Sequence, residues 1–438
     1  MRRYRSALAL VAVLWVTVLM MVLVSVAAQS SLLDSRISQI ENEKQRCRWA
    51  CRAGIETAVA LLLEDDRAYD GLTDLWADNP DELEELDYGG VTLTIKVVDA
   101  ASKLNINTAS AAQLLFLPDM TEETADSIQD WIDSDDEVRT GGAESGYYLN
   151  LDIGYWSRNA AVRSSRELLR VKGVTEGFFY GDSEKELISV ENEGWINYLT
   201  CWSQEINQDS TGTTRVNVNR ANTETLRTGV GLSDAQARWV SENRRFRTLS
   251  ALLGGSSTGA TAAGQSQQTQ SSPQQSQTSR QTQATQQTQT SQQTRQNGQQ
   301  QQQQPSTPLD WQTLLTVVDK ISLVNRQFIT GKVNVNTAGV EVLTAMFEGN
   351  RELAQNLIAA RQGQGGVFAD LSELQQADGM SQDILQKYLD MLTVRSSVFE
   401  IHATAVSNAT GLQYNVEAIV NRDLSQGQIT YWREGVSR

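Results

Sequence analysis

The N-terminus of this chain carries a long apolar run that constrains how the rest can fold. Arg2, Arg3 and Arg5 precede residues 6–33, a stretch with no charged residue, no proline and no glycine. About 20 apolar residues are enough to cross a bilayer as a helix, and basic residues ahead of such a segment hold its N-terminus in the cytoplasm. The sequence therefore predicts a single-pass anchor over residues 1–28, with the remainder beyond the membrane.

A cleaved secretory signal is the alternative interpretation of this run. The apolar core of such a signal is usually about 7–15 residues long and ends in small residues. Here the core extends from Ala7 to Val26, although Ala27, Ala28 and Gln29 imitate a cleavage site. The longer core favours the anchor.

The helix is expected to continue beyond the membrane to about Leu63. No proline or glycine interrupts it before Gly54, and a rod of roughly 80–90 Å results from its length. Apolar residues recur in steps of three and four, as on one helix face: Leu33, Ile37, Ile40, Cys47, Cys51, Ile55, Ala58 and Leu62. The other face is polar: Asp34, Arg36, Gln39, Glu41, Glu43 and Arg46. We expect the outer half to pack on a globular head that includes residues 29–100; a plain juxtamembrane helix is the alternative.

The composition excludes several classes of function. A net charge of −16 and a pI near 4.7 disfavour nucleic acid as the main partner, because phosphate binding depends on clustered Lys and Arg. The three cysteines give no disulfide framework, and His402 is the only histidine of the chain. An enzyme is therefore not favoured, whereas an acidic surface suits Ca²⁺, which prefers oxygen ligands.

Strand patterns appear at only two places. Residues 88–98 alternate and are rich in β-branched residues, and three short strands are predicted at residues 398–406, 412–420 and 428–432. A single strand after the long helix would be an unpaired edge. The first strand is therefore expected to join the three strands of residues 396–438 in one antiparallel sheet on the helix, which is an α+β fold with a large all-α insertion at about residues 101–396.

The insertion repeats itself. An Asn-x-Asn motif with Ala two residues later, starting at Asn105, Asn217 and Asn334, precedes a pair of short helical stretches each time. Self-similarity of this kind indicates repeated supersecondary units, and the pattern resembles helix-hairpin-helix or SAM-like modules. We predict three such units, over residues 101–200, 201–330 and 331–395.

The second unit is interrupted by a segment of a different kind. Residues 256–308 are almost entirely Gln, Ser, Thr and Gly, and Arg280 and Arg295 are the only charges. Such a composition cannot offset the entropy of ordering, so a disordered surface loop is expected.

An acidic cluster ends a predicted helix of the first unit. Asp130, Asp133, Asp135 and Asp136 come close together, and Gly141, Gly142 and Glu144 follow. A helix C-terminus disfavours negative charge, so either a bound Ca²⁺ or full solvation must stabilise these carboxylates. The spacing does not match an EF-hand loop.

Taken together, these features resemble the K-type minor pseudopilins of the type II secretion system (general secretion pathway protein K). The residues that carry the resemblance are the anchor with Val13-Leu14-Trp15, the Asn-Ile-Asn-Thr-Ala unit and the string that starts at Asp130-Trp131-Ile132-Asp133 and continues to Tyr148. The resemblance implies a pilin-like head and a non-enzymatic subunit of the inner membrane, with its C-terminal domain in the periplasm. It also implies a place at the pseudopilus tip, where the subunit assembles with I-type and J-type minor pseudopilins and the inner-membrane secretion assembly to start pseudopilus formation for protein export.

The same resemblance implies a structural Ca²⁺ at the acidic loop. Matching the string residue by residue makes the candidate ligands Asp130, Asp133, Asp135, Asp136 and Glu144.

Processing by prepilin peptidase is the point at which this chain departs from the pilin pattern. The peptidase expects Gly before the cut, whereas this chain has Arg5 before Ser6. If maturation leaves Ser6 first, the fifth residue is Leu10, so the Glu found there in most pilins is absent, as the K type implies.

Two other functions remain open from the sequence. Helix-hairpin-helix modules also occur in membrane-anchored DNA receptors of competence-like systems, where Gly-rich hairpins grip phosphate. Only the second hairpin, with Gly229 and Gly231, retains such a turn, and the first is acidic at Glu122 and Glu123. A generic anchored scaffold is the third interpretation.

Overall fold

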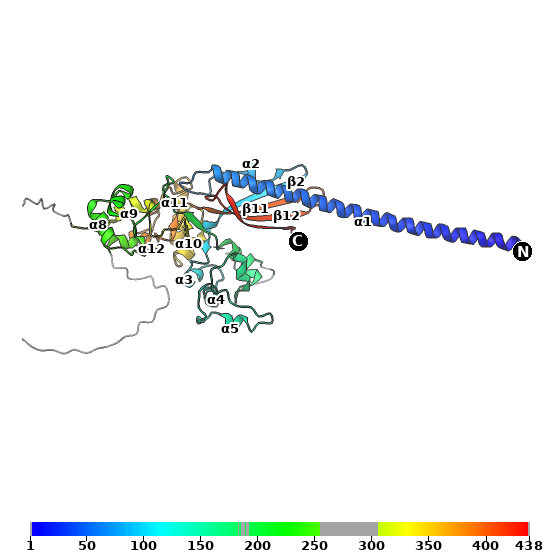
Figure 1. Cartoon of the computed structure of the whole chain (residues 1–438), viewed down its shortest axis with the longest axis horizontal. Helices are drawn as coiled ribbons and strands as arrows, with labels where there is room; N and C mark the ends of the chain where they lie inside the picture. The colour runs from blue at the N-terminus through cyan, green and yellow to red at the C-terminus, as the bar shows by residue number, and fades with distance from the viewer. Residues whose placement is uncertain (1, 183, 185–188, 190–191, 255–304, 437–438) are drawn as a thin grey trace, which may run out of the picture.

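The computed structural model describes residues 2–182, 184, 189, 192–254 and 305–436. Its N-terminal element is one unbroken helix, α1 (Arg2–Glu64), which projects from one end of the molecule (Figure 1). By length and composition α1 is able to cross a membrane. The predicted rod is thus confirmed as a helix, and Gly54 does not interrupt it.

The two halves of α1 have different surroundings. On the predicted apolar face, Cys47, Ile55 and Leu62 are fully buried, whereas Leu33 and Ile37 are 58% and 60% exposed. Only the second half therefore packs on the head, and the apolar side chains described from Val11 to Ile40 face outward.

The structure corrects the prediction for Glu43, which was placed on the polar face of the helix. Its side chain is buried, and its Oε2 accepts a hydrogen bond of 2.7 Å from the Ser407 hydroxyl. Its Oε1 accepts one of 3.0 Å from Arg46. The carboxylate is tolerated because both oxygens have a donor.

The head contains one antiparallel sheet of strand order β1-β2-β11-β12-β13. The predicted joining of an early strand to three C-terminal strands is confirmed, since β2 pairs with β11 from Asp99–Phe399 to Val91–Ser407. Apolar side chains on one face of the sheet and the buried face of α1 form a single core. The elements are α2 (Pro80–Leu83), β1 (Leu86–Asp87), β2 (Val91–Asp99), β11 (Val398–Ser407), β12 (Gln413–Asn421) and β13 (Gln428–Val436).

Three units and their connections occupy the insertion, and they share a second core. The first contains η1 (Ala100–Ser102), β3 (Leu104–Asn105), α3 (Ala111–Leu114), α4 (Glu122–Ile132), α5 (Ser145–Tyr148), η2 (Ser165–Arg170), α6 (Glu176–Tyr180), η3 (Trp195–Asn197) and β4 (Leu199–Thr200). The middle unit contains β6 (Val216–Asn217), α7 (Thr223–Thr225), η4 (Leu226–Val230), α8 (Asp234–Glu242), η5 (Leu249–Leu253), α9 (Trp311–Val317), η6 (Val318–Lys320) and β7 (Ile321–Ser322). The third contains β9 (Val333–Asn334), α10 (Val340–Met346), α11 (Arg351–Gly363), η7 (Leu371–Gln376), α12 (Gln382–Tyr388) and β10 (Leu392–Thr393).

The prediction of wholly helical units is wrong in one respect. In each unit a two-residue strand at the start of the Asn-x-Asn motif pairs in parallel with a two-residue strand at the end of the unit: β3 with β4, β6 with β7, and β9 with β10. The backbone groups beside the Asn-x-Asn motif need partners when they are buried. The last residues of the same unit supply them.

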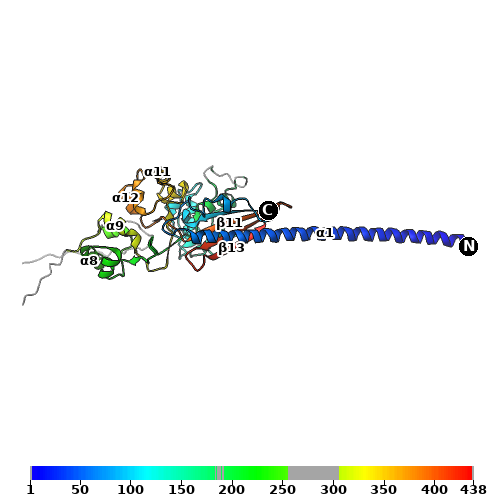
Figure 2. The ribbon, with the colours of Figure 1, turned by 90° about the horizontal axis from the view of Figure 1, so that it is seen from above.

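The middle unit is carried outward on a short ribbon. Strands β5 (Gln204–Ile206) and β8 (Phe328–Thr330) pair in antiparallel fashion and flank the unit in the sequence. Both views place α8 and α9 at the end of the molecule opposite the N-terminus of α1 (Figures 1 and 2). The predicted disordered segment 256–308 lies outside the described residues, apart from residues 305–308.

Candidate functional site

The repeated Asn-x-Asn motif is a structural clamp. In the third unit, the Asn334 side chain accepts a hydrogen bond from the backbone N–H of Asn336 at 3.0 Å. The Asn336 amide in turn donates to the Phe368 carbonyl at 2.9 Å and accepts from the Phe368 N–H at 2.8 Å. The same contacts recur with Asn105, Asn107 and Val162 in the first unit, and with Asn217, Asn219 and Phe246 in the middle unit.

The clamp explains why the motif repeats without implying a ligand. Its polar atoms bind the loop that follows the paired helices of the same unit, so the motif closes each unit on itself. The turn before the second helix of each pair also binds N–H groups of that helix. Thr121, Ser233 and Asn350 each accept a hydrogen bond from an N–H group in the first turn of α4, α8 and α11, respectively. These N–H groups are the ones that would otherwise point at a phosphate.

The structure brings three of the predicted calcium ligands together. Asp130 lies in the last turn of α4, Asp133 caps its C-terminus, and Glu144 directly precedes α5. One oxygen from each lies within 4.8 Å of the others. Gly142 permits this approach, because a Cβ atom there would lie 1.9 Å from Asp130 Oδ2.

The acidic site contains more carboxylates than cationic side chains. One nitrogen of Arg139 lies 2.5 Å from Asp130 and 2.5 Å from Asp133, which leaves an excess of negative charge. Burial, with Asp130 and Asp133 nearby, raises the pKa of Glu144 to about 7. Burial also raises the pKa of Asp133.

Two oxygens of the site have no partner. Asp133 Oδ1 and Glu144 Oε1 are buried without a hydrogen bond among the residues that the structure describes. Glu144 is 2% exposed, and only its Oε2 accepts a bond, from Ser157 at 3.1 Å. Unsatisfied carboxylate oxygens of this kind are the ligands that a hard cation prefers, so the residues present fit Ca²⁺.

Asp135 and Asp136 lie outside this group of three. Asp135 is exposed and accepts a hydrogen bond from the Glu137 N–H at 3.0 Å. Asp136 is bound by Asn159 at 3.2 Å, and that bond, with others from Ser145, lowers the pKa of Asp136.

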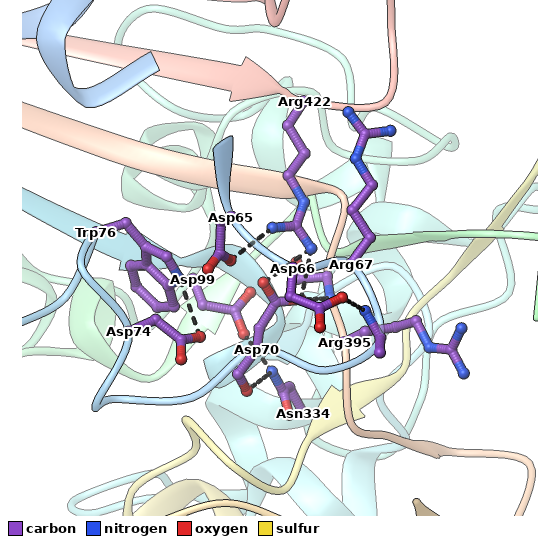
Figure 3. Close-up of polar contacts among 12 residues, drawn as sticks. Asp65, Asp66, Arg67, Asp70, Asp74, Trp76, Asp99, Asn334, Arg395 and Arg422 are labelled. Atoms are coloured by element: carbon purple, nitrogen blue, oxygen red, sulfur yellow. Dashed lines mark hydrogen bonds and ion pairs between the residues drawn. The ribbon is translucent and has the colours of Figure 1, made fainter. Parts of the chain in front are cut away.

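A second acidic group was missed by the sequence reasoning. One oxygen from each of Asp65, Asp70 and Asp74 lies within 4.8 Å of the others, where the chain leaves α1. Arg422, after β12, lies 3.1 Å from Asp65 and 2.8 Å from Asp70 (Figure 3). The recurrence of aspartates after the helix, at positions 65, 66, 70 and 74, was the available signal, but Arg422 is remote in the sequence.

This junction cluster, defined as Asp65, Asp70, Asp74, Asp99 and Arg422, connects the head to the third unit. Asn334 of the third unit donates to Asp99 at 2.9 Å and to the Asp70 carbonyl at 3.2 Å (Figure 3). Burial raises the pKa of Asp70 well above its usual range; Arg422 opposes the shift, and Asp99 adds to it. Burial also raises the pKa of Asp99.

Arg5 and Ser6, the predicted processing junction, lie within α1. Their side chains fall outside the part of the chain that the structure describes. Processing therefore stays a prediction.

Comparison with known proteins agrees with the resemblance inferred from the motifs. Residues 97–179 and residues 333–395 each match a family model described as type II secretion system protein K. The putative type II secretion system protein K of Escherichia coli strain K12 is 28% identical over 196 residues, which cover 39% of this chain and 59% of that protein. The chain thus aligns with about three fifths of the length of that relative.

A solved structure is similar over a larger part of the chain. It is the crystal structure of the GspK–GspI–GspJ complex of the enterotoxigenic Escherichia coli type 2 secretion system, matched over 91% of this chain and 99% of that chain, with a TM-score of 0.48 and 13% identity. Its sequence similarity is low, and the assignment does not depend on it. The two matched segments and the curated relative support the interpretation that this chain is a protein K of a type II secretion system.

Proposed function

We propose that this chain is a non-enzymatic minor pseudopilin at the tip of the type II secretion pseudopilus. The first half of α1 anchors it in the inner membrane, with the N-terminus in the cytoplasm and the head and units in the periplasm. The observation that carries the proposal is the division of α1: its first half exposes apolar side chains, and its second half is buried on an antiparallel sheet. The matched family models supply the secretion system.

The partners proposed are the I-type and J-type minor pseudopilins. Between the membrane-spanning part of α1 and the head, Leu33, Ile37 and Ile40 are 58%, 60% and 48% exposed on one helix face. Exposed apolar side chains in such a row are typical of a surface that another helix covers. We expect the equivalent helices of the two partners to pack there.

Co-purification tests this assembly. The full-length chain is expressed with the I-type and J-type pseudopilins of the same cell, extracted in neutral detergent and separated by size-exclusion chromatography. We expect an equimolar three-protein complex, weakened by changing Leu33, Ile37 and Ile40 together to Ser. A matched variant with Arg36, Gln39 and Glu41 changed to Ser should retain it; persistent monomers of the unchanged chain would contradict the proposal.

We further propose that the acidic site binds Ca²⁺ in a structural role. Asp130, Asp133 and Glu144 would hold the ion, and its charge would offset the excess negative charge that Arg139 leaves. Two buried oxygens without partners support this assignment. Asp135 and Asp136 are the outer candidates, since neither belongs to the group of three, although Asp136 also contacts Glu144.

The three units are proposed to be helix-hairpin-helix or SAM-like modules that serve as scaffold rather than as DNA grips. Their helix N-termini are capped by side chains of the same hairpins. Addition of the full-length chain should therefore leave the mobility of duplex DNA in a gel unchanged at low salt. A tight, salt-sensitive shift would favour the DNA-receptor alternative instead.

A further inference from the structure

The middle unit carries a group of arginines without carboxylate partners. Arg220, Arg244, Arg245 and Arg247, called here the arginine cluster, are exposed. The clamp brings them together, because Asn219, next to Arg220, accepts hydrogen bonds of 2.9 Å from the N–H groups of Arg245 and Phe246. Among the described residues none of the four forms an ion pair. Four exposed cationic side chains on two segments that the clamp joins are a local source of positive potential.

Most of the cluster is specific to the middle unit, although Arg163 follows the clamped Val162 of the first unit as Arg247 follows Phe246. After the second Asn of the motif, the first and third units have Thr108 and Thr337 where the middle unit has Arg220. Before the clamped residue, the other two units have Ala160-Ala161 and Gly366-Val367 in place of Arg244-Arg245. The common architecture of the units therefore does not require these arginines.

Arg245 is also held against its own backbone preference. Its φ is +90°, in the left-handed region that favours glycine. Side chains in this region are strained, and such strain gathers at functional positions. Arg244 has a local role as well, since it donates to the Ala221 carbonyl at 2.6 Å, so the inference rests mainly on Arg220, Arg245 and Arg247.

We propose that the arginine cluster is a docking surface for an acidic segment of another protein. The middle unit lies at the end of the molecule opposite the membrane anchor (Figures 1 and 2), so the cluster is remote from the lipid that holds α1. Between residues 201 and 254 no large apolar side chain is exposed. This surface therefore has no apolar side chain to insert into lipid and no exposed aromatic ring on which bases of single-stranded nucleic acid could stack. Guanidinium groups pair in bidentate fashion with carboxylates, and a surface without an apolar anchor gives fast, weak, salt-sensitive contact.

This docking surface deepens the proposed function, because it names the chemistry of a partner that would approach the distal end of a pseudopilin. The family models match residues 97–179 and 333–395, on either side of the middle unit. The partner is therefore expected to be particular to secretion systems whose protein K carries the arginine cluster.

Binding of a fluorescein-labelled polyglutamate peptide to the full-length chain in neutral detergent, followed by anisotropy, tests the inference. The net charge of −16 opposes such binding, so a signal must come from a local surface. We expect binding that weakens as salt rises, with a loss of roughly two- to fivefold for each of Arg220→Ala and Arg247→Ala. Arg227→Ala makes the same charge change in the same unit, but Arg227 is already paired with Glu224 at 2.8 Å, so this control should bind normally.

Arg245→Gly separates a binding role from a structural one. Glycine relieves the strain at φ +90°, so the melting temperature should hold or rise while peptide binding falls. A fall in melting temperature with unchanged binding would overturn the inference, as would equal losses in the cluster variants and in Arg227→Ala.

Competition identifies the class of ligand. Duplex DNA, anionic phospholipid vesicles and an acidic protein segment are each tested for displacement of the peptide. If DNA or vesicles displace it at a lower concentration than the acidic segment does, the partner is a nucleic acid or a membrane and the proposal is wrong. Absence of peptide binding would remove the inference, and the same preparations tested with the I-type and J-type pseudopilins would show whether the proposed function still stands.

Discussion

At the scale of single residues, the acidic site yields a test of calcium. Full occupancy should raise the melting temperature, since binding at about a hundred times Kd adds about 2.7 kcal/mol to the free energy of unfolding. Asp133→Asn and Glu144→Gln should each abolish most of that shift, because each replaces a carboxylate that has a buried, partnerless oxygen by a neutral amide. Asp135→Asn, at an exposed position, is the control that should keep it; scanning fluorimetry with calcium and with a chelator gives the answer.

The proton that Glu144 holds makes this effect depend on pH. Its folded pKa of about 7 lies above the ordinary 4.5, so its stabilising contribution is complete below about 4.5 and is lost as the pH rises through 7. The shift produced by calcium should therefore be larger above pH 7 than near pH 5. An equal shift at both values would remove Glu144 from the ligand set.

The sequence predicted which carboxylates could converge but not which ones do. Spacing alone gave Asp130, Asp133 and Glu144 no advantage over Asp135 and Asp136. The difference depends on the close approach of Gly142 to Asp130 and on the bond from Asn159 to Asp136. Both are tertiary contacts that no local pattern encodes.

At the scale of elements, α1 provides a matched pair of substitutions. Leu62 is fully buried against the sheet, and Leu33 is 58% exposed on the same helix. Leu62→Ala should lower the free energy of unfolding of the head by about 2–4 kcal/mol, because it removes packed methyl groups and leaves a cavity. Leu33→Ala should change it by less than about 0.5 kcal/mol.

Denaturant melts of the detergent-solubilised chain measure both variants. Equal effects would mean that the head does not depend on α1 for its core.

The long periodic elements were predictable, and the very short ones were not. The face of α1 that contains Cys47 and Ile55 and the alternation in β2 each extend over many residues, so the period was visible. Strands of two residues, such as β9 and β10, are too short to show any period, and they exist only because the ends of a unit meet. Glu43 is buried although the helix pattern placed it on the polar face, because the Ser407 hydroxyl, far along the chain, donates a hydrogen bond to its carboxylate.

At the scale of the whole molecule, the junction cluster should control how firmly the third unit is held to the head. Arg422→Met leaves Asp65 and Asp70 without their cation. Removing one partner of a buried pair costs about 3–5 kcal/mol. The loss should be greatest at high pH and shrink as the pH falls, because Asp70, whose pKa is already raised, then takes up a proton.

Thermal melts of Arg422→Met across pH measure this dependence. Arg48→Met is the control, since Arg48 pairs with Glu434 at 2.7 Å and both side chains are partly exposed. A deficit that does not vary with pH would show that the lost packing of Arg422, rather than the aspartate charges, is responsible.

The parallel ribbons that close the three units have an evolutionary consequence. In every unit the chain enters and leaves through adjacent strands, so the gap that a unit spans in the rest of the fold is only the width of one strand pair. Duplicating, deleting or exchanging a whole unit therefore leaves the surrounding backbone where it was. A protein built this way can lengthen by gene duplication without refolding its head, which makes the middle unit a position where secretion systems can diversify independently of their membrane anchor.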